Sequence, residues 1–296
     1  MKKTIFTGAA VAIVTPMFED GSINYEKLGN LIDWQIENST DAIVICGTTG
    51  ESACFTDQEH IDCIEFAVKR TAGRVPVIAG AGSNDTRYAL DLCKESKRLG
   101  ADALLQVTPY YNKTSQRGLI AHFTKLADAT DLPTILYNVP SRTGVNIAPA
   151  TYAELAKHPN IVATKEASGN LSQVAQIKAL CGDALDIYSG NDDQILPIMS
   201  LGGKGVISVL SNVMPKETHD MCAAYLNGDK EKAAQMQLKY LDLINHLFMD
   251  VNPIPVKEAL NLMGWDVGEC RLPLVSMEEA QVQKLAASMK AAGLLK

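Results

Sequence analysis

The segment "NIVATKE" at residues 160–166 has the composition of a buried strand, yet it carries a lysine near its end. Residues 161–164 are Ile, Val, Ala and Thr, without the alternation of apolar and polar residues that marks a half-exposed strand. This pattern is typical of a parallel strand covered on both faces. Lys165 follows directly, and the chain then turns at "SGN" (168–170). Because a buried ammonium group costs free energy unless it has a partner or a chemical role, Lys165 needs an explanation.

Seven other segments share this strand-like composition, which is rich in Val, Ile and Ala. They are "GAAVAIVTP" (8–16), "DAIVICGTTGE" (41–51), "VPVIAGAGS" (75–83), "ADALLQVTPYY" (101–111), "LPTILYNVP" (132–140), "LDIYSGN" (185–191) and "GVISVL" (205–210). Amphipathic segments lie between them, and residues 24–39 place Leu28, Leu31, Ile32 and Gln35 on one helical face. Strands that alternate with helices predict a parallel sheet.

Two further segments show helix signals. Residues 56–73 begin with Thr56, have Glu59 three positions later, as in a capping box, and end near a glycine. Residues 84–100 repeat this plan. Eight strand–helix units that close on themselves predict a (β/α)8 TIM barrel over residues 1–224.

After residue 224 the strand-like segments stop. The remaining sequence reads as helices punctuated by prolines, with no low-complexity linker before it: 229–250, 252–264 and 277–296. We therefore expect a C-terminal helical domain over residues 225–296.

Composition excludes several classes of protein. The chain has 296 residues, 47% hydrophobic and 21% charged, with a net charge of -7, which suits a globular protein with a sizeable core. It has no basic stripe for nucleic acid and no apolar run of about 18 residues for a membrane. Its seven cysteines are scattered without a CxxC pair, and its five histidines lack metal-ligand spacing. We expect free thiols, a cytoplasmic location and no metal site.

The N-terminus allows two interpretations. "MKKTIFTGAAVAIV" has a basic start and an apolar run, as signal peptides do, but it lacks a clear small-residue cleavage site. We favour the alternative, in which the apolar run is the first strand of the barrel.

Unusual residues gather at the predicted strand ends. In a barrel of this type, the loops at the carboxyl ends of the strands form one mouth, where the chemistry takes place. The residues expected there are Gly47, Thr48, Thr49, Gly50, Glu51, Thr108, Pro109, Tyr110, Tyr111, Tyr137, Asn138, Val139, Pro140, Arg142, Lys165, Glu166, Ser189, Gly190 and Asn191.

Two roles for Lys165 remain open from the residues alone. It could form a salt bridge, with Glu166 or Glu51 as its partner. It could instead be a Schiff-base nucleophile, because an apolar pocket favours the neutral amine, which attacks a ketone. The resulting iminium accepts electrons from a developing carbanion, and nearby tyrosine and threonine hydroxyls could move the protons that such a reaction requires.

The "GTTGE" turn (47–51) and Arg142 also have two interpretations each. The turn is neither a dinucleotide fingerprint nor a P-loop, and by itself it could be a plain turn between strand and helix. Its two threonines and its backbone N–H groups would nevertheless bind a carboxylate well. Arg142 could be an ordinary surface arginine or a second anion site, since guanidinium grips a carboxylate with two hydrogen bonds.

Four motifs together resemble the dihydrodipicolinate synthase family, within the pyruvate-dependent class I aldolases. They are "GTTGE" (47–51), "TPYYNK" (108–113), "YNVPSRTG" (137–144) and "KEASGN" (165–170). The resemblance runs from Gly8 to the C-terminal helices. It implies a (β/α)8 barrel with a C-terminal helical domain, in which Lys165 forms the imine with pyruvate.

The resemblance also implies roles for the other residues at the mouth. Tyr137 is similar to the central proton-transfer tyrosine, and Thr49 to the threonine that links it to Tyr111. Thr48 and Thr49 would hold the pyruvate carboxylate. The implied pyruvate site is lined by the backbone at Gly190 and Ile207. Tyr111 would reach across a dimer interface into the neighbouring subunit's site, so the dimer would be the minimal active unit and a homotetramer its expected assembly.

Arg142 points to one branch of the superfamily. The resemblance implies that this arginine receives the carboxylate of L-aspartate 4-semialdehyde, which condenses with pyruvate to give 4-hydroxy-tetrahydrodipicolinate, the committed step toward diaminopimelate and lysine. Neither a metal nor an organic cofactor is expected, because the lysine itself is the electron sink. The alternatives are an N-acetylneuraminate lyase-like or keto-deoxy-sugar-acid aldolase, and a barrel that only binds pyruvate-like ligands.

Some family members have a feedback site for L-lysine at the dimer interface. The matching residues here are Ser52, Ala53, His60, Asn84 and Tyr110. Asp57 stands where sensitive relatives have histidine, and Tyr88 where they have glutamate. A buried ammonium needs an acidic partner, so we expect a vestigial site and weak or no inhibition by L-lysine. Ordinary interface packing of the same residues would lead to the same expectation.

Overall fold

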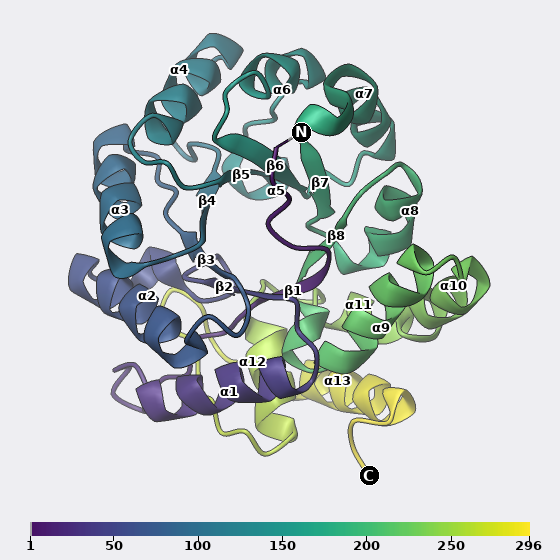
Figure 1. The fold of residues 1–296 in the computed structure, drawn as a ribbon. Helices are drawn as coiled ribbons and strands as arrows, with labels where there is room; N and C mark the ends of the chain where they lie inside the picture. Colours follow the sequence, from purple (N-terminus) through teal and green to yellow (C-terminus); the bar gives the residue numbers. More distant parts are fainter. Residues whose placement is uncertain (1) are drawn as a thin grey trace.

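The computed structural model describes residues 2–296 and contains a closed barrel of eight parallel strands (Figure 1). Each strand pairs with the next along the chain, and β8 pairs with β1 to close the barrel. The strands are β1 Gly8–Ala12, β2 Ala42–Ile45, β3 Val77–Gly80, β4 Ala103–Val107, β5 Thr134–Asn138, β6 Ile161–Glu166, β7 Asp186–Ser189 and β8 Gly205–Ser208. Every strand lies within one of the eight predicted segments, so the predicted barrel is confirmed. The apolar run near the N-terminus is β1.

Helices surround the barrel, as Figure 1 shows. They are α1 Tyr25–Glu37, α2 Asp57–Thr71, α3 Thr86–Leu99, α4 Gln116–Ala127, α6 Pro149–Leu155, α7 Leu171–Cys181, α8 Ile195–Ser200 and α9 Pro215–Leu226. Short helical turns lie in the loops: η1 Ser52–Cys54, α5 Pro140–Thr143, η2 Gly182–Ala184, η3 Asp192–Gln194 and η4 Leu210–Asn212. The helix features predicted for α1 and α2 are confirmed. Helix α1 buries the four expected residues, and Thr56 and Glu59 form the capping box of α2.

Strand register decides which side chains enter the barrel. Tyr137 on β5 is paired with Lys165 on β6, which is paired with Tyr188 on β7. Residues level with one another in a sheet point to the same face, and both tyrosines belong to the apolar cluster inside the barrel. Lys165 therefore shares the inner face with them. The next residue, Glu166, faces the helices.

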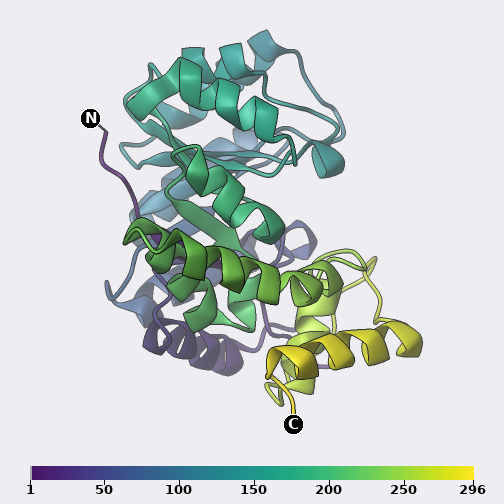
Figure 2. The ribbon, with the colours of Figure 1, turned by 90° about the vertical axis from the view of Figure 1, so that its right-hand side faces the viewer.

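Four helices follow α9: α10 Lys230–Lys239, α11 Leu241–His246, α12 Ile254–Leu262 and α13 Glu279–Ala292. The last two, α12 and α13, lie beside the barrel at the lower right of Figure 2. The expected helix over residues 229–250 is two helices, α10 and α11, which meet at Tyr240. The division of the chain at residues 224 and 225 stays a prediction.

The predicted chemistry of the cysteines is also seen. All seven are free thiols, five buried and two partly buried. Among residues 2–296, no helix is both long and apolar enough to span a bilayer.

Candidate active site

The side chain of Lys165 lines a cavity of about 170 Å³ at the carboxyl ends of the strands. Its walls come from separate loops, with Thr49 after β2, Tyr137 at the end of β5, Arg142 on α5 and Gly190 after β7. These four residues and Lys165 were predicted for one mouth, and the fold brings them together. Lys165 is 6% exposed, so its ammonium or amine is largely removed from solvent.

Neither of the proposed ion pairs of Lys165 is present. Glu166 accepts hydrogen bonds from Asn138 Nδ2 at 3.1 Å and from the Tyr152 hydroxyl at 2.9 Å, on the helix-facing side of the sheet. Glu51 is paired with Lys257 at 2.9 Å. Among residues 2–296, Lys165 has no carboxylate within 4.0 Å. A buried lysine without a pairing carboxylate leaves the chemical role as its explanation.

Lys165 is held between an aromatic ring and a glycine. Its Nζ lies 4.4 Å from the centroid of the Tyr137 ring. On the other side, a Cβ added to Gly190 would lie 3.2 Å from Lys165 Cε and 2.6 Å from Ala167 Cβ. Gly190 N also donates to Glu166 O at 2.8 Å, which fixes this close approach of backbone to lysine. Only glycine leaves room for the lysine stem at this point.

The "GTTGE" segment is a tight turn that separates its two threonines. Gly50 N donates to Gly47 O and Glu51 N to Thr48 O, both at 3.1 Å. Thr49 is buried and lines the Lys165 cavity, whereas Thr48 is exposed and lines the neighbouring cavity. The segment is therefore a tight turn, as the first interpretation expects, and its binding of a carboxylate stays a prediction.

A buried ion pair supports this turn from the C-terminal region. Glu51 has a left-handed backbone with φ 59, and its carboxylate accepts from Lys257 Nζ and from Arg271 N, both at 2.9 Å. Lys257 also donates to Glu269 O at 2.6 Å. Nothing in the sequence pattern indicated this pair, because its members are 206 residues apart.

Arg142 stands between two cavities and lines both. Its Nη2 donates to Asn252 O at 3.1 Å, and residues 2–296 offer the guanidinium no other hydrogen bond. Asn252 was missed by sequence reasoning, although it lines the Lys165 cavity and its Nδ2 donates to Thr49 Oγ1 at 3.0 Å. The sequence offers one weak signal for it, a lone asparagine at a proline-punctuated break between helices.

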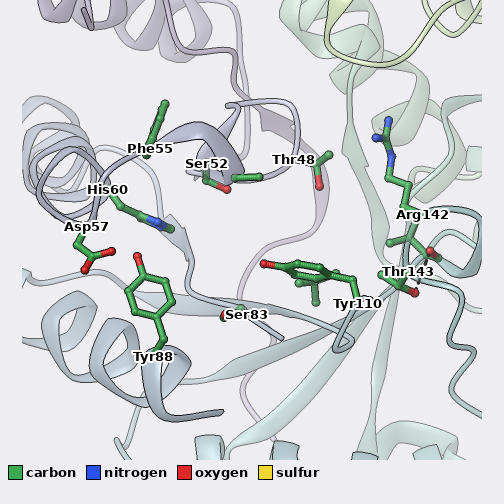
Figure 3. A pocket seen from close by; sticks show the side chains of 14 residues that line it. Thr48, Ser52, Phe55, Asp57, His60, Ser83, Tyr88, Tyr110, Arg142 and Thr143 are labelled. Atoms are coloured by element: carbon green, nitrogen blue, oxygen red, sulfur yellow. Dashed lines mark hydrogen bonds between the residues drawn. The ribbon is translucent and has the colours of Figure 1, made fainter. Parts of the chain in front are cut away.

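The neighbouring cavity, of about 390 Å³, contains most of the expected effector residues. Those that line it are Ser52, Ala53, His60 and Tyr110, together with the two departures Asp57 and Tyr88, whereas Asn84 is not among its lining residues. Figure 3 shows Asp57 and Tyr88 close together at one end and Arg142 at the other, with Tyr110 between them.

The second cavity contains one carboxylate, that of Asp57, and one guanidinium, that of Arg142. Burial lowers the pKa of His60, whose Nε2 lies 2.7 Å from Gly80 O, so the ring is neutral near pH 7. Burial and then the adjacent Asp57 carboxylate raise the pKa of Tyr88 to about 12. Among the described residues that line the cavity, Asp57 has the only carboxylate.

Besides Thr48, two predicted catalytic or substrate-binding residues lie outside the Lys165 cavity of this chain. Tyr111 is 91% exposed and has a positive φ of 67, so it points away from the barrel surface. Ile207 is fully buried on β8, level with Ala10 of β1, inside the barrel. Among residues 2–296, no group of three or more His, Cys, Asp or Glu side chains is arranged to hold a metal ion.

Comparison with known proteins gives consistent matches over the full length. The model of the dihydrodipicolinate synthetase family matches residues 5–292. A 4-hydroxy-tetrahydrodipicolinate synthase from Lachnoclostridium phytofermentans is 60% identical, covering 98% of this chain and 99% of the relative.

Solved structures agree with these matches. A dihydrodipicolinate synthase from Cyanidioschyzon merolae with lysine bound is 45% identical, with a TM-score of 0.96, covering 99% of this chain and 100% of that one. A dihydrodipicolinate synthase from Acinetobacter baumannii, complexed with pyruvate, is 42% identical, with the same TM-score and coverage.

Proposed function

The chain belongs to the dihydrodipicolinate synthetase family, and from this we propose that it condenses pyruvate with L-aspartate 4-semialdehyde to give 4-hydroxy-tetrahydrodipicolinate. The observation that carries the proposal is Lys165, which is buried at the end of β6 in a cavity of about 170 Å³, with no carboxylate of residues 2–296 within 4.0 Å. An enclosed amine that is not engaged in an ion pair is free to attack the carbonyl carbon of a ketone.

The first half of the reaction takes place on Lys165. Its Nζ attacks C2 of pyruvate, water leaves, and an iminium forms. The iminium nitrogen draws electrons from C3, so a C3 proton is lost and an enamine results. Tyr137 lies against Nζ and is the group placed to move these protons, with Thr49 in the same cavity as the next hydroxyl. Thr49 and the turn around it hold the pyruvate carboxylate, with Thr48 on the adjoining side.

The second half joins the two substrates. The enamine C3 attacks the aldehyde carbon of the semialdehyde, and the new alkoxide takes up a proton. The amino group of the semialdehyde then attacks C2 and displaces Lys165, which closes the ring and frees the enzyme. The free donors of Arg142, at the outer side of the cavity, bind the carboxylate of the semialdehyde and orient its aldehyde toward Lys165. Gly190 shapes the wall of the pyruvate site, and Ile207 belongs to the apolar cluster inside the barrel that supports Tyr137.

Tyr111 suggests a dimer as the active unit. A tyrosine that is 91% exposed at a positive φ gains nothing from its own chain. We infer that it enters the cavity of a second copy and completes the hydroxyl series of Tyr137 and Thr49 there. A tetramer would then be a pair of such dimers. The free cysteines suggest a reducing compartment, and we place the enzyme in the cytoplasm.

The larger cavity bears on regulation. The Cyanidioschyzon relative has been solved with lysine bound. We propose that the corresponding site in this chain, formed by Ser52, Ala53, His60, Tyr110 and the nearby Asn84, is vestigial. A second ammonium entering it would meet one carboxylate, that of Asp57, which already faces the Tyr88 hydroxyl.

Substrate choice tests the proposal directly. Purified enzyme is given pyruvate with L-aspartate 4-semialdehyde, or with a sugar aldehyde, and product formation is followed. The proposal expects turnover with the semialdehyde alone. Turnover of a sugar acid in either direction, with none of the semialdehyde, would favour the aldolase alternative, and binding of pyruvate without turnover would favour a non-enzymatic barrel.

A further inference from the structure

Glu166 is a buried carboxylate on the helix-facing side of the sheet, directly after Lys165 in the chain. It is 1% exposed, and among residues 2–296 no lysine, arginine or histidine nitrogen lies within 4.0 Å of its carboxylate. A buried charge without a counter-charge needs hydrogen bonds to offset its desolvation. The groups that donate to Glu166 therefore indicate what this carboxylate does.

Three donors from separate segments converge on Glu166. Asn138 Nδ2, at the end of β5, lies 3.1 Å from both carboxylate oxygens. The Tyr152 hydroxyl of α6 donates to Oε2 at 2.9 Å, and Ser168 N, after β6, donates to Oε1 at 2.9 Å. An ionised carboxylate only accepts, so it matches these donors. Burial, and then the Glu166 carboxylate, raise the pKa of Tyr152, so its hydroxyl keeps the proton that it donates.

The side-chain amide of Asn138 has one possible orientation. Asn138 is fully buried, and its Oδ1 accepts from Ile147 N at 3.0 Å. Because a backbone N–H can only donate, the atom that faces Ile147 must be the amide oxygen, and Nδ2 must then face Glu166. Nδ2 also donates to Asn146 Oδ1 at 2.8 Å. The contact between Asn138 and Glu166 is therefore fixed in direction as well as in place.

This contact joins the two strands that carry Lys165 and Tyr137. Tyr137 is paired with Lys165 in the sheet, and their side chains lie inside the barrel. The next residues, Asn138 and Glu166, are paired as well and lie on the opposite face. The pairing of the strands is irregular near the start of β5, and a slip of one residue would turn every side chain to the other face. The contact at the far end fixes the register where Lys165 Nζ lies 4.4 Å from the centroid of the Tyr137 ring.

We propose that Asn138 and Glu166 are positioning residues that hold the Tyr137 hydroxyl in place for proton transfer at Lys165. This rests on the proposed function, in which Lys165 Nζ attacks C2 of pyruvate. The hydroxyl of the resulting carbinolamine leaves as water after it takes up a proton, and Tyr137 is the acid placed to donate that proton. Neither positioning residue touches the reacting atoms. Both act through the backbone of β5 and β6, so a weakened contact should slow formation of the iminium.

The experiment measures how fast pyruvate becomes attached to the enzyme. Borohydride is added at successive times, and the adduct on Lys165 is quantified by mass spectrometry. Glu166→Gln keeps the shape of the side chain but places an amide NH2 among groups that donate. We expect its initial trapping rate to fall about tenfold or more, since a misplacement of about 1 Å can cost roughly 10²-fold in rate. A wild-type rate in this variant would overturn the proposal.

Asn160→Ala is the matched control for stability. Asn160 directly precedes β6, at the opposite end from Lys165, and its Nδ2 donates to Ala127 O and Thr130 O, both at 3.0 Å. This variant loses hydrogen bonds beside the same strand, so its melting temperature should fall while its trapping rate equals that of wild type. Slowing as great as that of Glu166→Gln would show that any weakening of β6 slows the reaction, and the proposal would be wrong.

A double-mutant cycle separates positioning of Tyr137 from a general weakening of the site. Tyr137→Phe removes the hydroxyl, and its slower trapping is followed over hours. If Glu166 acts through that hydroxyl, adding Glu166→Gln to Tyr137→Phe should leave the trapping rate unchanged within about twofold. A fall in rate as large as the one that Glu166→Gln causes in the wild-type background would overturn the proposal.

Two further comparisons decide if Glu166→Gln does not fold alone or if Tyr137→Phe forms no adduct. Tyr152→Phe removes one donor to Glu166 and keeps the ring, and it should also trap pyruvate more slowly. Asn138→Asp sets two carboxylates against each other, and adding Glu166→Gln to it restores a donor and an acceptor, so the double variant should trap faster than Asn138→Asp. A wild-type rate in Tyr152→Phe, or no gain in the double variant, would overturn the proposal. Failure of the proposed function looks different, because wild-type enzyme would then form no adduct with pyruvate.

Discussion

Replacing Lys257 with methionine tests how the C-terminal helices support the active-site turn. The Lys257 and Glu51 side chains are 2% and 0% exposed, and their charged atoms lie 2.9 Å apart. Lys257→Met keeps most of the volume but leaves the Glu51 carboxylate buried with one remaining donor, Arg271 N. Breaking a buried pair from one side costs about 3–5 kcal/mol, because the remaining charge is desolvated without compensation.

This cost can be converted into a melting temperature. Unfolding entropy is about 2.1 cal/mol/K per residue, which gives roughly 0.6 kcal/mol/K for this chain. The variant should therefore melt about 5–8 °C below wild type in scanning calorimetry. Activity should fall too, since the same turn carries Thr48 and Thr49.

Two controls sharpen the test. Lys216→Met breaks an exposed pair with Asp220 and should shift stability by less than about 1 kcal/mol. The double variant Glu51→Gln, Lys257→Met removes the isolated charge, so it should be more stable than Lys257→Met alone. A melting temperature of Lys257→Met within a degree of wild type, or a double variant less stable than the single one, would refute the reasoning.

Three other predictions concern the two cavities. Arg142→Ala removes a charge-assisted contact worth roughly 1.5–3 kcal/mol, so the KM for the semialdehyde should rise about tenfold or more while pyruvate trapping persists; an unchanged KM would count against the role. Gly190→Ala places a Cβ 3.2 Å from Lys165 Cε and 2.6 Å from Ala167 Cβ, and such overpacking costs about 1–3 kcal/mol. The rate of adduct formation, measured by borohydride trapping at successive times, should fall. A rate equal to that of wild type would mean that the neighbouring side chains move to make room for the added Cβ. L-Lysine should inhibit initial rates weakly or not at all at saturating pyruvate, because Asp57 is the one carboxylate among the described residues that line the larger cavity; half-inhibition well below a millimolar would point to Asp57 as an effective replacement anion.

The sequence was informative where local pattern decides structure. The eight strands, the capping box at Thr56 and the meeting of Lys165 and Tyr137 at one mouth follow from composition, spacing and the rule that barrel strands end at one mouth. Prediction from the sequence was wrong, or gave no indication, where contacts join segments that are distant in the chain. Glu51 was a suggested partner of Lys165, but it pairs with Lys257, and the pattern of neither segment records that meeting.

The sequence pattern also did not predict the direction in which each side chain of a turn points. Thr48 and Thr49 are adjacent and chemically alike, yet the turn sends one to each cavity. Asn252 was missed for a related reason, since a lone asparagine between two helices carries no periodicity. Its role depends on which loop the C-terminal helices bring to Thr49, and that is a property of tertiary packing.

The role of Lys165 is tested by locating the residue to which pyruvate becomes attached. Enzyme is incubated with pyruvate, reduced with borohydride, digested, and the modified residue is located by mass spectrometry. We expect one reduced adduct per chain, on Lys165, and none in Lys165→Ala, which should also lose most of the rate. A borohydride-stable adduct of wild-type yield in that variant, or an adduct on another lysine of the native enzyme, would show that Lys165 is not the Schiff-base lysine.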